Sequence, residues 1–340
     1  MKVKIEEKEE KEKNQIQKII EISTPSQIFC LGLTLILLGY TPKLIHSCHS
    51  YTRFRRLEKP EYTHESFEDF WMVIPCSIVL RLLKMFINTY TYEFFKRKLS
   101  HKYSGDELDR KVKKCTRGGF KVLYFSFTFY FGLFKVLRMT NFAPSIMFGN
   151  GELLYTLGDW PYTPMPSTLK FYYLLSFSYY VEDGIVHLFL PPNYDYWEMV
   201  LHHVITSMLI FSSYMSGFWC IGIFVLIQMD FEDIWIGLIR VIMDFSSVAT
   251  LSLLYLLLMA GWGWFRFYTF SFCVVYSFAM GTRVAVDNYP DVVTVIAMLL
   301  VTLLGLNIYW FALLLKMGIT LIRGKPKDLQ MVVSKKDLQD

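Results

Sequence analysis

The sequence predicts an all-α polytopic membrane protein with about eight transmembrane helices, on the strength of two observations. First, 53% of the 340 residues are hydrophobic and 17% are aromatic, whereas only 19% are charged, which is less charge than a soluble domain carries. Second, the apolar residues gather in stretches of about twenty, the length that an α-helix needs to cross the ~30 Å hydrocarbon core of a bilayer. A lipid bilayer is therefore the first expected partner, and no nucleic-acid partner is expected.

Eight stretches meet this requirement. In chain order they are residues 27–45, 70–94, 120–139, 169–190, 199–219, 220–243, 263–284 and 291–316. Pro42 and Lys43 shorten the first stretch, because a proline removes a helical hydrogen bond and a lysine is costly in lipid. The segment 246–262 is apolar as well. Gly261 and Gly263 near its end favour a re-entrant or interfacial helix there over a ninth span.

The polar segments divide the chain into four parts. Residues 1–26 are a mixed-charge tail that we expect to be mobile, and residues 27–114 hold the first two spans and a basic loop. Residues 115–320 hold the other six spans, and residues 321–340 form a basic tail. The first twenty residues lack the basic patch and short apolar core of a cleavable signal peptide, so we expect the first span to act as its own insertion signal.

Charge orients the spans. The loop 96–121 carries ten Lys and Arg residues against three acids, and loops rich in cations stay on the cytosolic side of the membrane. The loop 140–168 has no Lys or Arg and is expected in the lumen, and alternation then places the tail 321–340 in the cytosol. The basic stretch 53–59 falls where this scheme predicts the lumen, so the side of the first span stays open.

The pair His202-His203 interrupts an apolar run, MVLHHVITSMLIFSSY. Two titratable side chains at membrane depth are costly unless they face a polar interior, so they indicate a functional site. Thr206 follows four residues after the first histidine and three after the second, and residues at this spacing share a helix face. We therefore expect the hydroxyl of Thr206 beside the imidazoles.

The two neighbouring spans also carry ionisable residues. The span before the histidines adds Glu182, Asp183 and His187, and the span after them adds Asp230, Glu232 and Asp233. Asp230 and Asp233 share a helix face, and Glu232 points elsewhere. Three successive spans thus bring ionisable groups to the interior, which predicts a polar cavity between them.

Such a cavity suits acid–base chemistry. A neutral imidazole can take a proton from an attacking nucleophile, or act as the nucleophile itself, near neutral pH. A carboxylate beside it would hold its tautomer and stabilise the imidazolium, and we expect Asp230 and Asp233, which share a helix face, to supply that partner. The alternatives are a buried polar network that only fixes helix packing, and a metal site. Adjacent histidines on a helix diverge by about 100° and chelate one ion poorly, and no HxxxH or HxxHH spacing occurs, so we expect no bound metal.

The segment 196–243 resembles the Lag1 motif of ceramide synthases, within the wider TLC family of membrane proteins. The matching residues are Tyr196, Trp197, Glu198, Met199, His202, His203, Thr206, Ser213, Tyr214, Gly222, Asp230 and Asp233. The Trp160-Pro161 dipeptide, the run LKFYYLLSFSYYVEDG and the ending LGLNIYWFALLLKM are also similar to the family. The resemblance covers residues 115–318, and the ordered set of HH, T, SY and DxxD is more specific than any one piece.

The resemblance implies a multi-pass enzyme of the endoplasmic reticulum that joins a fatty acyl-CoA to the amino group of a sphingoid base. It implies a barrel of six helices, the TLC domain at 115–320, around a central cavity for the acyl chain. Acyl-CoA would be a cosubstrate, with no bound cofactor, and a homo- or hetero-oligomer is compatible with the family. Carried over by position, the catalytic residues are His202, His203, Asp230 and Asp233. The supporting residues near the substrates are Thr206, Asp183, Glu182, Tyr214, Glu232 and Trp310.

The sequence departs from the family pattern beside the two aspartates. Met229 stands where the family usually has a histidine, and Glu232 stands for its serine. The first change removes a polar group from the expected cavity and the second adds a charge. Two other functions therefore stay open: a non-catalytic lipid-binding or membrane-assembly protein of the TLC family, and an intramembrane metal-dependent lipid hydrolase.

Overall fold

The computed structural model describes residues 25–60, 65–137, 160, 162, 165–190, 195–281 and 290–322. Within these ranges every regular element is helical. The tail expected at the start of the chain lies outside the described residues up to residue 24, as does most of the loop 140–168, and the C-terminal tail lies outside them from residue 323.

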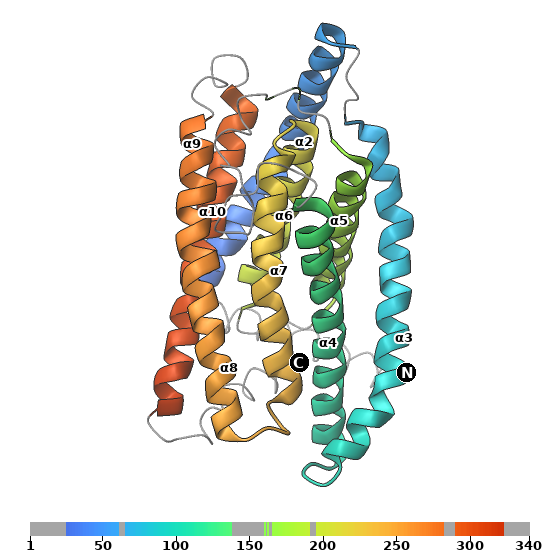
Figure 1. Ribbon diagram of the computed structural model, residues 1–340, viewed down its shortest axis with the longest axis vertical. Helices are drawn as coiled ribbons and strands as arrows, with labels where there is room; N and C mark the ends of the chain where they lie inside the picture. Colours follow the sequence, from blue (N-terminus) through green and yellow to red (C-terminus); the bar gives the residue numbers. More distant parts are fainter. Residues whose placement is uncertain are drawn as a thin grey trace, which may run out of the picture.

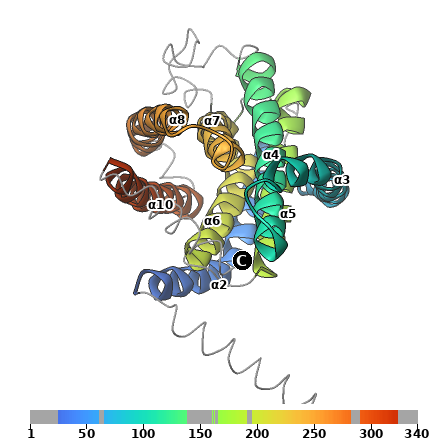
Figure 2. The ribbon, with the colours of Figure 1, turned by 90° about the horizontal axis from the view of Figure 1, so that it is seen from below.

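The helices form an elongated bundle (Figure 1). In chain order they are α2 (Pro25–Glu58), η1 (Phe67–Met72), α3 (Val73–Leu99), α4 (Gly105–Phe131), η2 (Gly132–Val136), α5 (Ser167–Leu188), α6 (Tyr196–Met215), α7 (Trp219–Ile242), α8 (Val248–Gly261), η6 (Trp262–Tyr276), α9 (Ser277–Gly281) and α10 (Pro290–Ile322). Seen along the bundle, α6 lies at the centre and α3 on the outside, against α4 and α5 (Figure 2). The central helix packs on α2, α5, α7 and α10, so its side chains line the interior.

Four of the described helical segments are long and apolar enough to cross a membrane. They are Pro25–Glu58, Phe67–Leu99, Val248–Met280 and Asp291–Lys316. The other long helices, α4 to α7, carry tyrosines, histidines and charged residues along their length. Many of these polar side chains are buried inside the bundle, which is where a membrane helix keeps its polar residues.

Three sequence-based boundaries need correction. The segment 246–262 is no separate re-entrant helix, because α8 continues through a π-helical stretch, η6, into α9 as one rod. The first helix does not end near Pro42 but runs on to Glu58. The basic loop expected at 96–121 is mostly helical, because α3 ends at Leu99 and α4 begins at Gly105.

The α3–α4 and α7–α8 turns meet at one end of the bundle, the lower end in Figure 1. The Tyr103 hydroxyl donates a hydrogen bond of 2.7 Å to the Asp244 carboxylate, and Lys111 lies 3.7 Å from the same carboxylate. We call this the basic end, because the cations of the 96–121 segment gather there.

The opposite end of the bundle holds a buried ion pair. Arg55, near the end of α2, donates to Glu65 at 2.9 Å, and both side chains are 2% exposed. The neighbouring Arg56 donates to the backbone carbonyl of Glu65 at 3.1 Å. Part of the basic stretch 53–59 is therefore tied to the segment that leads into α3.

Candidate functional site

The two histidines of α6 face different surroundings. His202 lines a cavity in the centre of the bundle, whereas His203 is 7% exposed and faces α5. Their ring centroids lie 5.7 Å apart. Successive residues of a helix diverge by about 100°, so one turn of α6 can present an imidazole to each side.

The cavity beside His202 is almost entirely apolar, and its lining residues bound about 560 Å³ of empty space, part of which is open to solvent. Helices α5, α6, α7, α9 and α10 contribute to its wall. The lining residues on α6 run from His202 to Ser213, which at 1.5 Å per residue is a length of roughly 17 Å. This is about one leaflet of the ~30 Å hydrocarbon core, so the lining of the cavity matches a lipid chain in length and polarity.

Phenylalanine rings line the far end of the cavity, away from His202. Phe218 and Phe278 both line the wall, and their rings meet edge to face at 5.1 Å. Trp160 stacks on Phe218 at 4.7 Å and donates to the carbonyl of Ser216 at 2.9 Å. This aromatic group gives the cavity a packed floor.

His202 has few polar neighbours. Its Nδ1 lies 3.5 Å from the hydroxyl oxygen of Thr206, as the four-residue spacing predicts. The ring of Trp310 on α10 meets the imidazole edge to face at 5.3 Å, and Tyr180 on α5 lies at 6.2 Å. These neighbours hold the imidazole at the cavity wall, and none of the three carries a charge.

His203 faces a carboxylate on the neighbouring helix. Its Nε2 lies 3.8 Å from an oxygen of Asp183, and neither ring nitrogen has a hydrogen-bond partner in the described part of the chain. The ring of His187 lies 5.8 Å away. The close approach of α5 depends on Gly184, because a Cβ there would come within 3.2 Å of the Cβ of His203.

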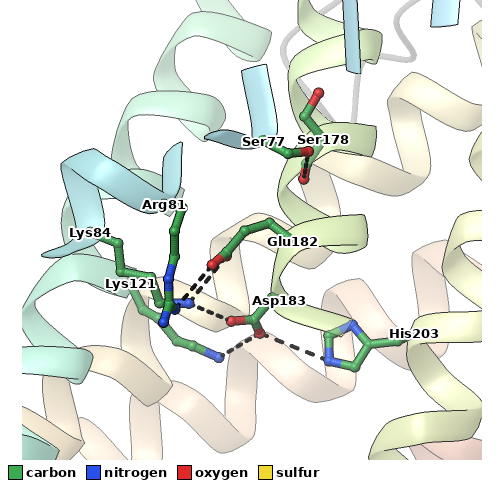
Figure 3. A network of polar contacts seen from close by, with 8 residues as sticks. All are labelled: Ser77, Arg81, Lys84, Lys121, Ser178, Glu182, Asp183 and His203. Carbon is green, nitrogen blue, oxygen red and sulfur yellow. Dashed lines mark hydrogen bonds and ion pairs between the residues drawn. The ribbon is translucent and has the colours of Figure 1, made fainter. Parts of the chain in front are cut away.

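Three cations surround the acids of α5 (Figure 3). Lys84 of α3 lies 2.8 Å from Asp183 and 3.3 Å from Glu182, and Arg81 lies 3.3 Å from Glu182. Lys121 of α4 contacts the second oxygen of Asp183 at 3.4 Å, the same oxygen that faces His203. We call this group the α5 charge cluster: Arg81, Lys84, Lys121, Glu182 and Asp183.

The acids of α7 lie elsewhere. Asp230 is 3% exposed and accepts a hydrogen bond of 3.4 Å from the Tyr172 hydroxyl, and Asp233 accepts one of 3.3 Å from Arg266. Glu232 is fully buried against Gly261, and its oxygens have no hydrogen-bond partner among the residues that the structure describes. The carboxylate that the structure sets against a histidine is therefore Asp183, and not one of the two α7 aspartates that we expected in that place.

Tyr214 also lies away from the histidines. Its hydroxyl donates a hydrogen bond of 2.7 Å to Asp69, and its ring packs against Phe70 at 5.3 Å. These contacts join α6 to the short helix η1 before α3. Tyr214 supports the bundle in this structure, three turns from His202.

Sequence reasoning missed the cations of the site. Lys84 and Arg266 each interrupt an apolar span, which is the same signal that drew attention to the histidines. Arg266 is 3% exposed and donates to Asn307, to the carbonyl of Met229 and to Asp233. The sequence places Lys121 in the basic loop, because the start of α4 at Gly105 is not evident from the residue pattern.

The fold and the buried polar site are those of a polytopic helical membrane protein. The sequence model described as the TLC domain matches residues 114–316, and the chain belongs to this family. It is similar to a ceramide synthase of Caenorhabditis elegans, hyl-2, with 23% identity over 78% of this chain and 83% of the relative. It is also similar to the sphingosine N-acyltransferase lac1 of Schizosaccharomyces pombe, with 25% identity over 61% of this chain and 55% of the relative. Human ceramide synthase 1 is 28% identical over 51% of this chain and 52% of its own length.

Within the described ranges, no group of three or more His, Cys, Asp or Glu side chains is placed to hold a metal ion. His203 and Asp183, which lie 3.8 Å apart, share their surroundings with two lysines. A lysine ammonium repels a metal cation, so the chemistry of this site is best read from its imidazoles and carboxylates.

Proposed function

We propose that the protein is an N-acyltransferase that joins a fatty acyl-CoA to the amino group of a sphingoid base, in the membrane of the endoplasmic reticulum. The observation that carries the proposal is the place of His202, an imidazole in the wall of an apolar cavity as long as a lipid chain. The relation to ceramide synthases supports the substrate class.

The cavity orders the reactants. The acyl chain would lie along α6 toward Phe218 and Phe278, with the thioester carbonyl beside His202. The anionic CoA would remain at the basic end, where cations attract a polyanion over several ångströms. An apolar wall also excludes water, which would otherwise compete with the amine for the thioester.

The imidazole of His202 can serve the transfer in either of two ways. In a direct reaction the amine attacks the thioester carbon, a C–N bond forms as the C–S bond breaks, and one amine proton passes through the imidazole to the departing thiolate. In a two-step reaction the imidazole takes the acyl group first and the amine then displaces it. A burst of released CoA before the steady state distinguishes the second route from the first.

The two α7 aspartates receive a different role in this proposal from the one their spacing suggested. Asp230 would fix Tyr172, and Asp233 would hold Arg266 between α7 and α10. Both act on the packing of the helices that form the cavity wall. Met229, which lines the cavity, makes the wall more apolar than a histidine would and favours the chain over the head group there.

The test is transfer of a labelled acyl group by the purified protein. We expect labelled ceramide from wild type with long-chain acyl-CoA and a sphingoid base, and loss of the product in His202→Ala. Equal labelling from both proteins would refute the role of His202. Wild type that binds lipid but transfers no acyl group, at any chain length, would instead indicate a non-catalytic member of the TLC family.

A further inference from the structure

The α5 charge cluster draws on a helix outside the TLC domain. The family match begins at residue 114, whereas Arg81 and Lys84 lie on α3. Helix α3 packs on α4 and α5, at the outside of the bundle (Figure 2). A segment before the domain therefore supplies two of the three cations that face the acids of α5.

The contacts of Asp183 link Lys84 on α3 to His203 on α6. Lys84 holds one carboxylate oxygen at 2.8 Å, and the other oxygen lies 3.4 Å from Lys121 and 3.8 Å from the Nε2 of His203 (Figure 3). A carboxylate held from one side keeps its second oxygen aimed at the imidazole. His203 in turn occupies the space that Gly184 leaves open, which fixes the rotation of α6 at this turn.

Burial increases the structural cost of losing these contacts. The side chains of Lys84 and Asp183 are 10% and 15% exposed. Removing one partner of a buried ion pair leaves an uncompensated charge, which is far more disruptive than the loss of a surface pair. Without Lys84, the lysine left beside Asp183 in the described part of the chain is Lys121, whose contact with it is longer and more exposed.

We propose that Lys84 is a positioning residue, which acts through Asp183 and His203 to keep His202 directed into the cavity. The inference rests on the proposed acyl transfer. Each helix around Asp183 presents a charged or titratable group to it or to its partners: Arg81 and Lys84 from α3, Lys121 from α4, Glu182 and His187 from α5, and His203 from α6. Among these groups Lys84 alone contacts both acids of α5. Its loss would therefore free both carboxylates from one of their partners.

The experiment measures steady-state transfer by Lys84→Met, Lys84→Arg, Asp183→Asn and the Lys84→Met/Asp183→Asn double variant. We expect Lys84→Met to lower kcat about tenfold or more, because small displacements of a catalytic group are costly. KM stays within about twofold, since Lys84 is not among the residues that line the cavity. Lys84→Arg restores most of kcat, and the double variant is no slower than Asp183→Asn.

Arg55→Met is the matched control, because it breaks a buried ion pair at the opposite end of the bundle. It lowers Tm but leaves kcat per folded molecule unchanged. A Lys84→Met protein with the kcat of wild type, or effects of Lys84→Met and Asp183→Asn that multiply in the double variant, would overturn the proposal. If Lys84→Met does not fold, Lys84→Gln, which keeps one donor for Asp183, takes its place with the same criteria. Wild type without any transfer removes the proposed function itself, a result separate from unchanged kcat in the variants.

Discussion

Replacing Gly222 by alanine tests how tightly α5, α6 and α7 are packed around the cavity. A Cβ at this position would overlap the hydroxyl oxygen of Tyr173 and approach Ser213 Oγ to 2.9 Å. Those two oxygens share a buried hydrogen bond of 2.7 Å. The tyrosine is 1% exposed, so its ring can withdraw only into the cavity that it lines.

The expected cost follows from two terms. Overpacking of a buried site costs about 1–3 kcal/mol, and loss of the Tyr173–Ser213 hydrogen bond leaves a buried hydroxyl unsatisfied, at about 1–3 kcal/mol. Against this, glycine to alanine within a helix gains about 1 kcal/mol. The net destabilisation of Gly222→Ala is therefore about 1–5 kcal/mol.

Thermal unfolding of the purified protein in detergent measures the effect. Gly305→Ala on α10 is the control, because a Cβ there meets no atom within 4 Å, and we expect it to unfold at the same temperature as wild type or slightly higher. Gly222→Ala should unfold at a clearly lower temperature, and Tyr173→Phe should recover part of the loss, since it removes the overlapping oxygen. If Gly222→Ala and Gly305→Ala had the same Tm, the reasoning on this contact would be wrong.

Two further predictions concern the two ends of the bundle. Phe278→Ala removes one of the two phenylalanine rings that line the floor of the cavity, and we expect the products from a mixture of acyl-CoAs to shift toward longer chains, as measured by mass spectrometry. An unchanged distribution would contradict the direction assigned to the chain. At the basic end, burial and the hydrogen bond to Asp244 raise the pKa of Tyr103 above its usual value, so the folded state favours the protonated phenol. That stabilisation is complete below the unfolded-state pKa of about 10 and declines as pH rises above it. The difference in Tm between wild type and Tyr103→Phe should therefore narrow from pH 8 to pH 11, and a constant difference would refute this account.

The helical class of the fold could be predicted because burial in a membrane requires a simple residue pattern. Long apolar runs require helices, and the ionisable residues within them must face the interior. Glu182, His203 and Asp230 are all buried in the bundle, as that argument predicts. The spacing of His202 and Thr206 also placed their side chains together.

Contacts between helices could not be predicted in the same way. Residue spacing fixes which side chains share a face of one helix, but not which neighbouring helix that face meets. The two α7 aspartates were expected beside the imidazoles. Asp183 lies there instead, because Gly184 lets α5 pack closely against α6. Lys84 reaches the same acid from a helix that the motif does not include.

Helix boundaries were hard to predict for a related reason. Gly261 favoured a separate interfacial helix that ends nearby, yet the helix continues through this residue into η6. The glycine serves packing instead, because its missing side chain makes room for the carboxylate of Glu232 on α7. A glycine selected for close packing and one selected for a turn look alike in sequence. Only the neighbouring helix distinguishes them.

The buried pair of Arg55 and Glu65 has a consequence for how the chain enters the membrane. If the basic end stays in the cytosol, the end that holds this pair must be translocated together with the stretch 53–59. The two partners are only ten residues apart, so they can neutralise one another while α2 and α3 are still emerging as a hairpin. The net charge that the folded protein keeps at this end is therefore smaller than the number of basic residues suggests, because Arg55 is half of a neutral pair.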